Sequence, residues 1–282
     1  MIAFTIWPLN IYRYGIMYVI SILIQIWRFR WIAQSQILAK DYPRVHHLIQ
    51  HGIDTLVMVI VMGIIIWGRL GHVLIYEWSY YSQHPLQIFN LQAWGMSFVG
   101  WFVWVMIAVI CYMRYHKIGF GDALTIRDLI CTFLPFNIAL GRFGNRLNQE
   151  LYGRVVDISS WSDSFISWLQ HIHIITTYSS IDSQLRRNTN LLEWCFEGIV
   201  LGILTIVTRI LTYHTNSIKT GYITATFMIG YSIIRFLLEP LRDNPATEFV
   251  GIWNKSQLWM IIMGIVGIWL IFYLRSHYKK WS

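Results

Sequence analysis

The sequence predicts an all-α integral membrane protein that crosses the bilayer about seven times. Apolar residues make up 56% of the 282 residues and charged residues only 13%, whereas soluble domains carry about 25% charged residues. The apolar residues occur in long runs, not in the alternating or one-sided patterns of segments that face water. No removable signal peptide is expected, because the first apolar run lacks a basic start and a small-residue cleavage site.

The predicted spans are apolar runs long enough to cross about 30 Å of hydrocarbon at about 1.5 Å per residue. Arg127 and Asp128 stand near the start of the fourth run and weaken its apolar character there. In chain order, the predicted spans are residues 14–32, 55–76, 97–115, 124–145, 192–213, 221–241 and 257–274.

The net charge of +8 is attributed to membrane topology. No nucleic-acid partner is expected, because Lys and Arg cluster in short segments between the apolar runs. By the positive-inside rule, these basic segments face the cytoplasm. The segment from Glu77 to Met96 contains neither Lys nor Arg and is predicted to lie outside, which places the N-terminus outside and the C-terminus inside. The basic segments contain Arg28, Arg30, Lys40 and Arg44, then Arg114 and Lys117, then Lys219, and finally Arg275, Lys279 and Lys280.

One polar segment, residues 146–190, is too long for a simple connector between two spans. It falls on the outer side of the predicted topology. We expect it to form a cap or side arm inserted within a single transmembrane domain that takes up residues 1–282.

Ionisable residues within or beside the predicted spans point to the functional site, because a charge at membrane depth costs at least about 2.5 kcal/mol. Tyr231, Arg235, Glu239 and Arg242 are spaced by four, four and three residues, so on a helix they share one face. Two more arginines stand beside glycines, namely Arg69 in Gly-Arg-Leu-Gly and Arg142 in Gly-Arg-Phe-Gly-Asn.

A purely structural interpretation covers part of this pattern. Arg235 and Glu239 can form a buried ion pair while Arg242 reaches toward the interface, and the glycines can serve close helix packing. That interpretation leaves Arg69 and Arg142 unexplained. An excess of positive charge near the outer interface instead favours an anionic ligand, such as a lipid phosphate, held by guanidinium groups.

The segment from Gly141 to Arg154 is the most specific in the chain, because an apolar run ends there in many polar side chains and glycines. Asn145, Asn148 and Glu150 supply amide and carboxylate groups beside Arg142. These groups can bind a polyol head group or position a leaving group.

This segment resembles the signature G-R-x-G-N-x-x-N-x-E-x-x-G of the bacterial phosphatidylglycerol–prolipoprotein diacylglyceryl transferases. Residues 141–153 match it at every fixed position. The resemblance extends along the chain, through residues 2–4, 13–18, 68–71, 95–98, 191–193, 197–198 and 231–245.

The resemblance implies a seven-span enzyme of the bacterial inner membrane, with a periplasmic N-terminus and a cytoplasmic C-terminus. Such an enzyme moves the diacylglyceryl group of phosphatidylglycerol onto the lipobox cysteine thiol of a prolipoprotein, forming a thioether and releasing glycerol phosphate. Its expected partners are phosphatidylglycerol, prolipoprotein signal peptides and membrane lipids, and no metal or cofactor is expected. The reaction needs a base for a thiol of pKa near 8.5 and cations for the departing phosphate.

Matching the motifs residue by residue gives the expected site. The expected catalytic residues are Arg142, Arg235 and Tyr231. The residues expected to bind phosphatidylglycerol are Arg142, Asn145, Asn148, Glu150, Gly153, Arg69, Tyr14, Glu239 and Arg242.

The sequence departs from the family pattern at its expected catalytic histidine, where it has Val99. His72, beside the Gly-Arg-Leu-Gly motif, is the candidate substitute base, and its alternative role is packing at the interface. The chain is therefore a divergent transferase that uses another base or works slowly, or a homologue that binds phosphatidylglycerol without turnover. A channel or transporter is disfavoured, because the sequence shows no paired broken helices or matching halves.

Overall fold

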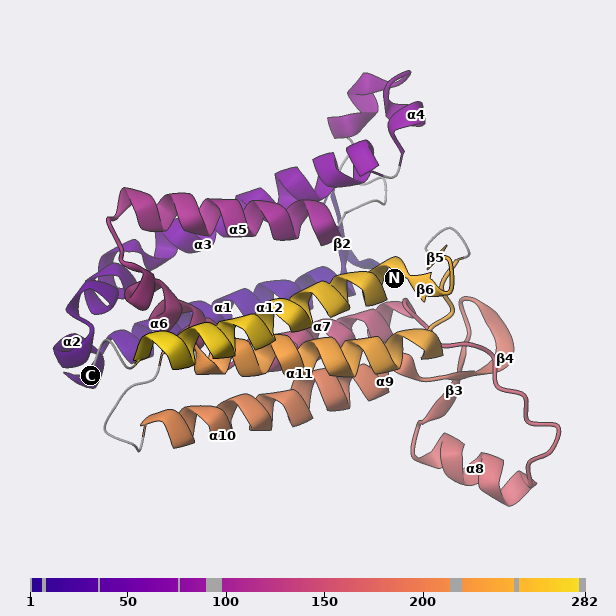
Figure 1. Cartoon of the computed structure of the whole chain (residues 1–282). Coiled ribbons are helices and arrows are strands. Elements are labelled where there is room, and N and C mark those ends of the chain that lie inside the picture. Colours follow the sequence, from indigo (N-terminus) through magenta and orange to yellow (C-terminus); the bar gives the residue numbers. More distant parts are fainter. Residues whose placement is uncertain are drawn as a thin grey trace. The chain divides into compact units, whose positions relative to one another are not determined.

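A computed structural model describes residues 2–6, 9–34, 36–75, 77–89, 98–213, 220–245 and 249–278. The chain divides into two compact units. Unit 1 consists of Met1–Phe4, Ile11–Ser21 and Leu124–Ser282, and unit 2 of Thr5–Asn10 and Ile22–Ala123. Helices dominate both units (Figure 1), and the described residues add three two-stranded sheets, the first formed by β1 (Ile2–Ile6) and β2 (Leu9–Tyr12).

Unit 2 is built around a pair of antiparallel helices, α3 (Pro43–Ile75) and α5 (Phe98–Tyr115). The Tyr112 hydroxyl donates a 2.7 Å hydrogen bond to the Gly52 carbonyl. Toward the other end of the pair, the rings of Trp67 and Trp104 stack with centroids 5.1 Å apart. The remaining elements are the end of α1 (Arg13–Ala33), α2 (Gln36–Asp41), α4 (Trp78–Tyr81) and η1 (Pro85–Phe89).

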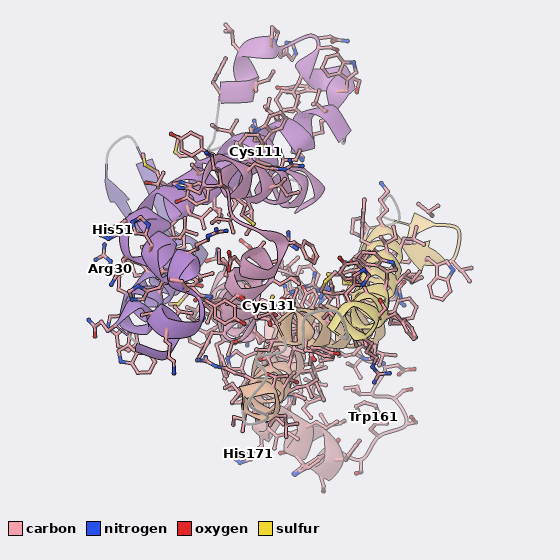
Figure 2. The ribbon with its side chains drawn as sticks, turned by 60° about the vertical axis from the view of Figure 1, so that its left-hand side comes forward. Arg30, His51, Cys111, Cys131, Trp161 and His171 are labelled. Atoms are coloured by element: carbon pink, nitrogen blue, oxygen red, sulfur yellow. The ribbon has the colours of Figure 1, made fainter. Side chains whose placement is uncertain are left out.

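Several charged and titratable side chains of unit 2 project outward. Arg30 and His51 are among them (Figure 2). Arg30 forms an exposed 3.0 Å ion pair with Asp54. Arg30 belongs to α1, and Asp54 lies on the part of α3 that precedes the predicted span. The helix begins at Pro43, whereas the sequence predicted a span from residue 55.

Unit 1 contains a bundle of helices. Their bounds are α6 (Phe120–Cys131, entering from unit 2), α7 (Leu134–Asn148), α9 (Thr189–Glu193), the π-helix η2 (Trp194–Val200), α10 (Leu201–Tyr213), α11 (Tyr222–Leu238), η3 (Glu239–Leu241) and α12 (Lys255–Tyr278). A short hairpin of β5 (Phe249–Val250) and β6 (Trp253–Asn254) precedes α12.

The helices of unit 1 pack closely where glycines allow it. A Cβ atom at Gly198 of η2 would lie 2.5 Å from the Cβ atom of Ala139 on α7, and one at Gly267 of α12 would lie 2.9 Å from Ile229 on α11. Asp128, an interruption of the fourth apolar run, has a structural role. Its buried carboxylate accepts hydrogen bonds from the Gly221 and Thr224 backbone N–H groups at the start of α11, and so caps donors that the helix itself leaves unpaired.

The polar segment predicted at 146–190 folds as a small subdomain of unit 1. Helix α7 continues to Asn148 and ends where Gln149 adopts a left-handed conformation, with φ of 57°. The segment then forms α8 (Asp163–His171) and the antiparallel strands β3 (Ile175–Tyr178) and β4 (Asp182–Arg187). Val156, Leu169 and Ile175 form its core, with Trp161 packed against them. We call residues 149–188 the arm.

Four helical segments among the described residues are long and apolar enough to cross a membrane, namely Pro43–Leu74, Thr189–Thr212, Tyr222–Leu241 and Lys255–His277. A fifth is obtained if α6 and α7, bent by 41°, form one broken span. The other two predicted ranges coincide with helices α1 and α5, but neither passes the same test on the described residues. A membrane protein with several helical spans is thereby confirmed, and the count of seven stays a prediction.

Candidate functional site

Three arginines and three glutamates form one buried ionic network in unit 1. The network joins α7, the continuous helix α9–η2, and the end of α11 with η3. Its glutamates are almost completely buried, with Glu193 and Glu197 at 0% exposure and Glu239 at 3%. The members of the network are Arg142, Glu193, Glu197, Arg235, Glu239 and Arg242.

Glu193 is the centre of this network, because it contacts all three arginines. Its Oε1 atom lies 2.6 Å from Arg235 Nη1 and 2.6 Å from Arg242 Nε. Its Oε2 atom accepts a 2.7 Å hydrogen bond from Arg242 Nη2 and lies 3.1 Å from Arg142 Nε. One carboxylate therefore fixes three guanidinium groups that lie 51, 42 and 49 residues away in the sequence.

Glu197 and Glu239 complete the pairing. Glu197 Oε2 accepts hydrogen bonds of 3.0 Å and 2.8 Å from Arg142 Nε and Nη2, and Glu197 Oε1 lies 3.4 Å from Arg235 Nη1. Glu239 pairs with Arg235 Nη2 and also accepts a 2.8 Å hydrogen bond from Asn244. The Arg235–Glu239 pair of the purely structural interpretation is present.

The wide turns of η2 help to bring the two central glutamates to the arginines. Glu193 and Glu197 are four residues apart on one helix, so their side chains lie on the same face. From Trp194 to Val200 that helix has π-type i→i+5 hydrogen bonding, which is common at functional sites. Gly198 then permits the close contact with α7 that places Glu197 beside Arg142.

This geometry corrects one expectation about charge. The predicted excess of positive charge is wrong for the described network, because three carboxylates balance its three guanidinium groups. In the purely structural interpretation Arg242 reached toward the interface, but it is only 6% exposed. It follows the end of α11 on extended backbone, and its bidentate pairing with Glu193 offsets the cost of burying its charge.

The chain beside Arg242 is held by the start of the arm. The Arg154 N–H donates to the Leu241 carbonyl at 3.0 Å, and the Asp243 N–H donates to the Tyr152 carbonyl at 3.2 Å. Between them, Gly153 forms a β-bridge with Arg242. A side chain at Gly153 would collide with the Arg187 carbonyl oxygen, so this predicted substrate-binding residue has a packing role.

Arg186 of β4 strengthens this junction. Its guanidinium pairs with Asp182 and Asp243, each at 2.7 Å, and lies 4.8 Å above the Tyr152 ring. The hydrogen bond to Asp182 and, to a smaller extent, the one to Asp243 raise the pKa of Arg186. The arm is thus attached by one ionic contact to Asp243, the residue that follows Arg242.

Asn145, Asn148 and Glu150 lie at the end of α7. The Asn145 carbonyl accepts a 2.9 Å hydrogen bond from the Glu150 N–H, and Asn148 Nδ2 donates a 3.1 Å hydrogen bond to Glu150 Oε1. Burial raises the pKa of Glu150. Among the described contacts Glu150 pairs with none of the network arginines, and the buried Asn148 Oδ1 atom accepts no hydrogen bond, which leaves it able to accept one from a ligand.

Tyr231 lies one helical turn before Arg235 on α11 and stacks on Phe227, with ring centroids 5.6 Å apart. Because residues four apart on a helix lie on one face, its phenol lies on the face of α11 that carries Arg235. The structure therefore brings Tyr231, Arg142, Arg235, Glu239 and Arg242 together, as the sequence predicted.

Arg69 and His72 belong to unit 2, and their described contacts lie within that unit. Arg69 is buried and donates hydrogen bonds to the Tyr81 hydroxyl at 2.9 Å and to the backbone carbonyls of Gln87 and Ile88 at 3.0 Å and 3.1 Å. These bonds fix the segment after α3. His72 Nε2 lies 3.6 Å from Glu77 Oε2.

The roles predicted for Arg69 and His72 in substrate binding and base catalysis stay predictions. The side chains of Tyr14 and Val99 lie outside the described residues. Within the described part of the chain, no group of three or more His, Cys, Asp or Glu side chains is arranged to hold a metal ion.

Sequence reasoning missed the roles of Glu193 and Glu197, although both lie in segments that carry the family resemblance. The available signal was the same one that singled out the arginines. Two carboxylates four residues apart at the start of an otherwise apolar run need partners at membrane depth, and the unpaired Arg142 was the obvious one.

Comparison with known proteins gives matches over nearly the whole chain. The family model described as prolipoprotein diacylglyceryl transferase matches residues 1–273. A phosphatidylglycerol–prolipoprotein diacylglyceryl transferase of Nitrosomonas europaea is 33% identical, over 96% of this chain and 88% of its own length. Proteins of the same name from Chromobacterium violaceum and Legionella pneumophila are each 31% identical, over 96% and 95% of this chain and 94% of their own lengths.

Proposed function

This chain belongs to the prolipoprotein diacylglyceryl transferase family, and we propose that its buried ionic network is the centre of the transferase site. The chain transfers the diacylglyceryl group of phosphatidylglycerol to the lipobox cysteine thiol of a prolipoprotein. The observation that carries the assignment of the site is that Arg142 of the family signature meets Arg235, Glu239 and Arg242 in one network, through Glu193 and Glu197.

The chemistry requires that a sulfur–carbon bond forms while a carbon–oxygen bond to phosphate breaks. The thiol gives up its proton, its sulfur attacks the glyceryl carbon, and glycerol phosphate leaves with the bonding electron pair. Negative charge therefore grows on the phosphate in the transition state. Fixed guanidinium groups stabilise such charge without having to reorganise during the reaction.

Arg142 is the arginine that we assign to the phosphate. Its side chain is 13% exposed, whereas those of Arg235 and Arg242 are each 7% exposed. Its described hydrogen bonds use Nε and Nη2, and a guanidinium group has further donors on Nη1. Arg235 and Arg242 make their described contacts with carboxylates, so in this proposal they hold Glu193 and Glu197 in place for Arg142.

The head group of phosphatidylglycerol also carries hydroxyl groups, which need acceptors. Asn148 Oδ1 is buried and accepts no hydrogen bond in the described structure, so we assign it to a glycerol hydroxyl. Asn145, Glu150 and Tyr231 complete the proposed wall, with Tyr14 and Arg69 as further lipid contacts. His72 is the proposed base, because Val99 stands at the family's histidine position.

The proposed setting is the bacterial inner membrane, with phosphatidylglycerol and prolipoprotein signal peptides as substrates. Seven spans place the N-terminus and the arm in the periplasm and the C-terminus in the cytoplasm, with residues 1–282 as one transmembrane domain. No observation favours the alternative of lipid binding without turnover.

The test is lipidation of a synthetic lipobox peptide by the purified full-length chain in phosphatidylglycerol vesicles, followed by mass spectrometry. The expected product is a peptide heavier by one diacylglyceryl group on its cysteine. The relative from Nitrosomonas europaea serves as the positive control, and a peptide with serine in place of the cysteine as the negative control. Phosphatidylglycerol binding without product, while the control enzyme works, would refute turnover.

A further inference from the structure

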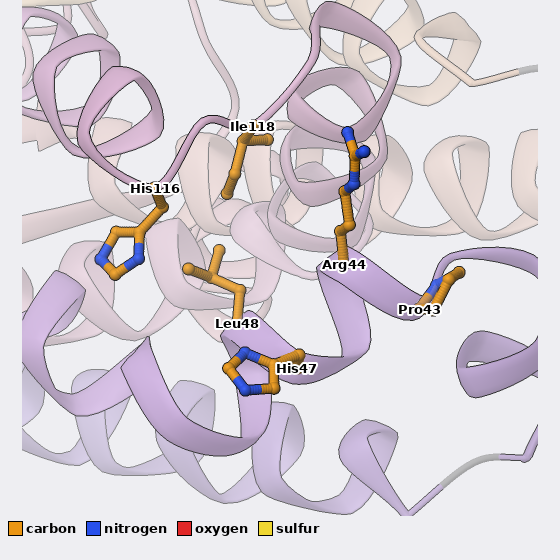
Figure 3. Close-up of a pocket in the computed structure, with 6 residues that line it drawn as sticks. All are labelled: Pro43, Arg44, His47, Leu48, His116 and Ile118. Atoms are coloured by element: carbon orange, nitrogen blue, oxygen red, sulfur yellow. The ribbon is translucent and has the colours of Figure 1, made fainter.

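Unit 2 contains a pocket of about 300 Å³ at the end of the α3–α5 pair that includes Pro43. The start of α3 and the turn after α5 line it. Figure 3 shows Leu48 and Ile118 between the side chains of His116 and Arg44. The lining residues are Pro43, Arg44, His47, Leu48, His116 and Ile118.

The contacts between α3 and α5 place this pocket just beyond the apolar part of the pair. The hydrogen bond from Tyr112 to Gly52 puts the last apolar turn of α5 level with Gly52 of α3. The pocket begins about one helical turn further along both helices, where the predicted topology puts the cytoplasmic head-group layer. Arg69 and His72 lie toward the opposite end of α3, so this pocket is separate from that part of unit 2.

The polar side chains that line the pocket are basic or titratable. Arg44, His47 and His116 are all exposed, and the six lining residues include no carboxylate. The His116 ring contacts the Tyr112 ring at 4.4 Å between centroids, which restrains its position. The backbone N–H groups in the first turn of α3 add partial positive charge.

Apolar side chains form the rest of the lining. Leu48 is 5% exposed and packs into unit 2, and Ile118 lies beside it in the pocket (Figure 3). A ligand that fits must therefore carry a negative group. It is either an amphipathic molecule with an apolar part or a small soluble anion. Basic pockets beside transmembrane helices on the cytoplasmic side are typical binding sites for anionic lipid head groups.

We propose that this pocket binds a phosphate group, presented by an anionic membrane lipid, with Arg44, His47 and His116 as its ligands. The shared chemistry is a phosphate ester, and a small soluble phosphate is the second source that the test must separate. The site is distinct from the ionic network, which lies wholly in unit 1. Its occupation would hold the start of α3 at the membrane surface through lipid contacts.

The experiment counts and measures lipid binding to the purified full-length chain in neutral detergent by native mass spectrometry. The probes are dioleoylphosphatidylserine, dioleoylphosphatidylcholine as the neutral lipid, and glycerol 3-phosphate as the soluble phosphate. We expect the wild type to retain one phosphatidylserine molecule. In Arg44→Gln the affinity for this phosphatidylserine should fall roughly fivefold, the effect expected for one cation removed. His116→Gln should weaken the same binding event, and Arg44→Lys should keep most of it.

The matched control is Arg114→Gln, which removes the same charge from the last turn of α5 without changing the pocket lining. Binding of phosphatidylserine alone identifies a lipid site, and equal binding of glycerol 3-phosphate identifies a small-phosphate site. An equal loss in Arg44→Gln and Arg114→Gln would overturn the proposal in favour of general surface charge. Phosphatidylserine binding that is unchanged in Arg44→Gln and His116→Gln would overturn it as well.

Discussion

The central position of Glu193 makes its replacement the most informative test of the network. In Glu193→Gln the side chain keeps its shape but loses its charge. Glu193 contacts Arg142, Arg235 and Arg242 and is fully buried. The substitution therefore leaves three buried guanidinium groups with two carboxylates.

The expected loss follows from the cost of breaking a buried ion pair. Removing one partner of such a pair destabilises a protein by about 3–5 kcal/mol, because the remaining charge stays buried without compensation. Glu193→Gln should lower the free energy of unfolding by an amount in this range. Glu150→Gln is the matched control, because glutamine keeps an oxygen that can accept the one described hydrogen bond of this side chain, from the neutral Asn148. This change should cost at most about 1 kcal/mol.

The measurement is unfolding of the purified variants in detergent, followed by tryptophan fluorescence, together with a double-mutant cycle. Arg242→Met removes one of the stranded positive charges, so Glu193→Gln/Arg242→Met should be more stable than the sum of the two single changes implies. A coupling of at least about 1 kcal/mol is expected between residues in one network. Equal small losses in Glu193→Gln and Glu150→Gln, or an additive cycle, would refute the network as a unit.

Four further changes test the site. Arg142→Ala and Arg235→Ala should each abolish lipidation of a lipobox peptide while the protein still inserts into membranes; product formed by either variant would contradict its assignment. His72→Ala should reduce the rate of lipidation as strongly as the arginine variants if His72 is the base, and an unchanged rate would end that role. Gly153→Ala should lower the melting temperature and the lipidation rate together, because its side chain would meet the Arg187 carbonyl. Gly121→Ala, at a helical glycine where an added Cβ atom meets no atom within 4 Å, shows the effect of the same change at another glycine, and equal effects would refute the packing role of Gly153.

Much of the candidate site was predictable from the sequence. Charges at membrane depth directed attention to Arg142, Arg235, Glu239 and Arg242, because each needs a partner or a ligand. The spacing of Arg235 and Glu239 allowed an ion pair as one of two interpretations, and the family signature connected Arg142 with Asn145, Asn148 and Glu150. These inferences depend on helical periodicity and on short motifs, which are local properties of the chain.

The charge of the site was not predictable in the same way. The sequence indicated a cluster of arginines that binds an anionic ligand, but the carboxylates of Glu193 and Glu197 neutralise this cluster. Both glutamates lie more than 35 residues from the arginines they contact. Glu197 and Arg235, for example, are 38 residues apart in the sequence. Local spacing carries no information about which distant helices become neighbours.

The sequence by itself determined that this chain is a membrane protein of the diacylglyceryl transferase family, because apolar runs and contiguous motifs are legible residue by residue. Only the tertiary structure decided how its charges are shared. The close contact of η2 with α7 brings Glu197 to Arg142, and the pairing of the arm with residues 241–243 holds Arg242 beside Glu193. Buried charges are stable only with partners, and those partners are assigned by helix packing.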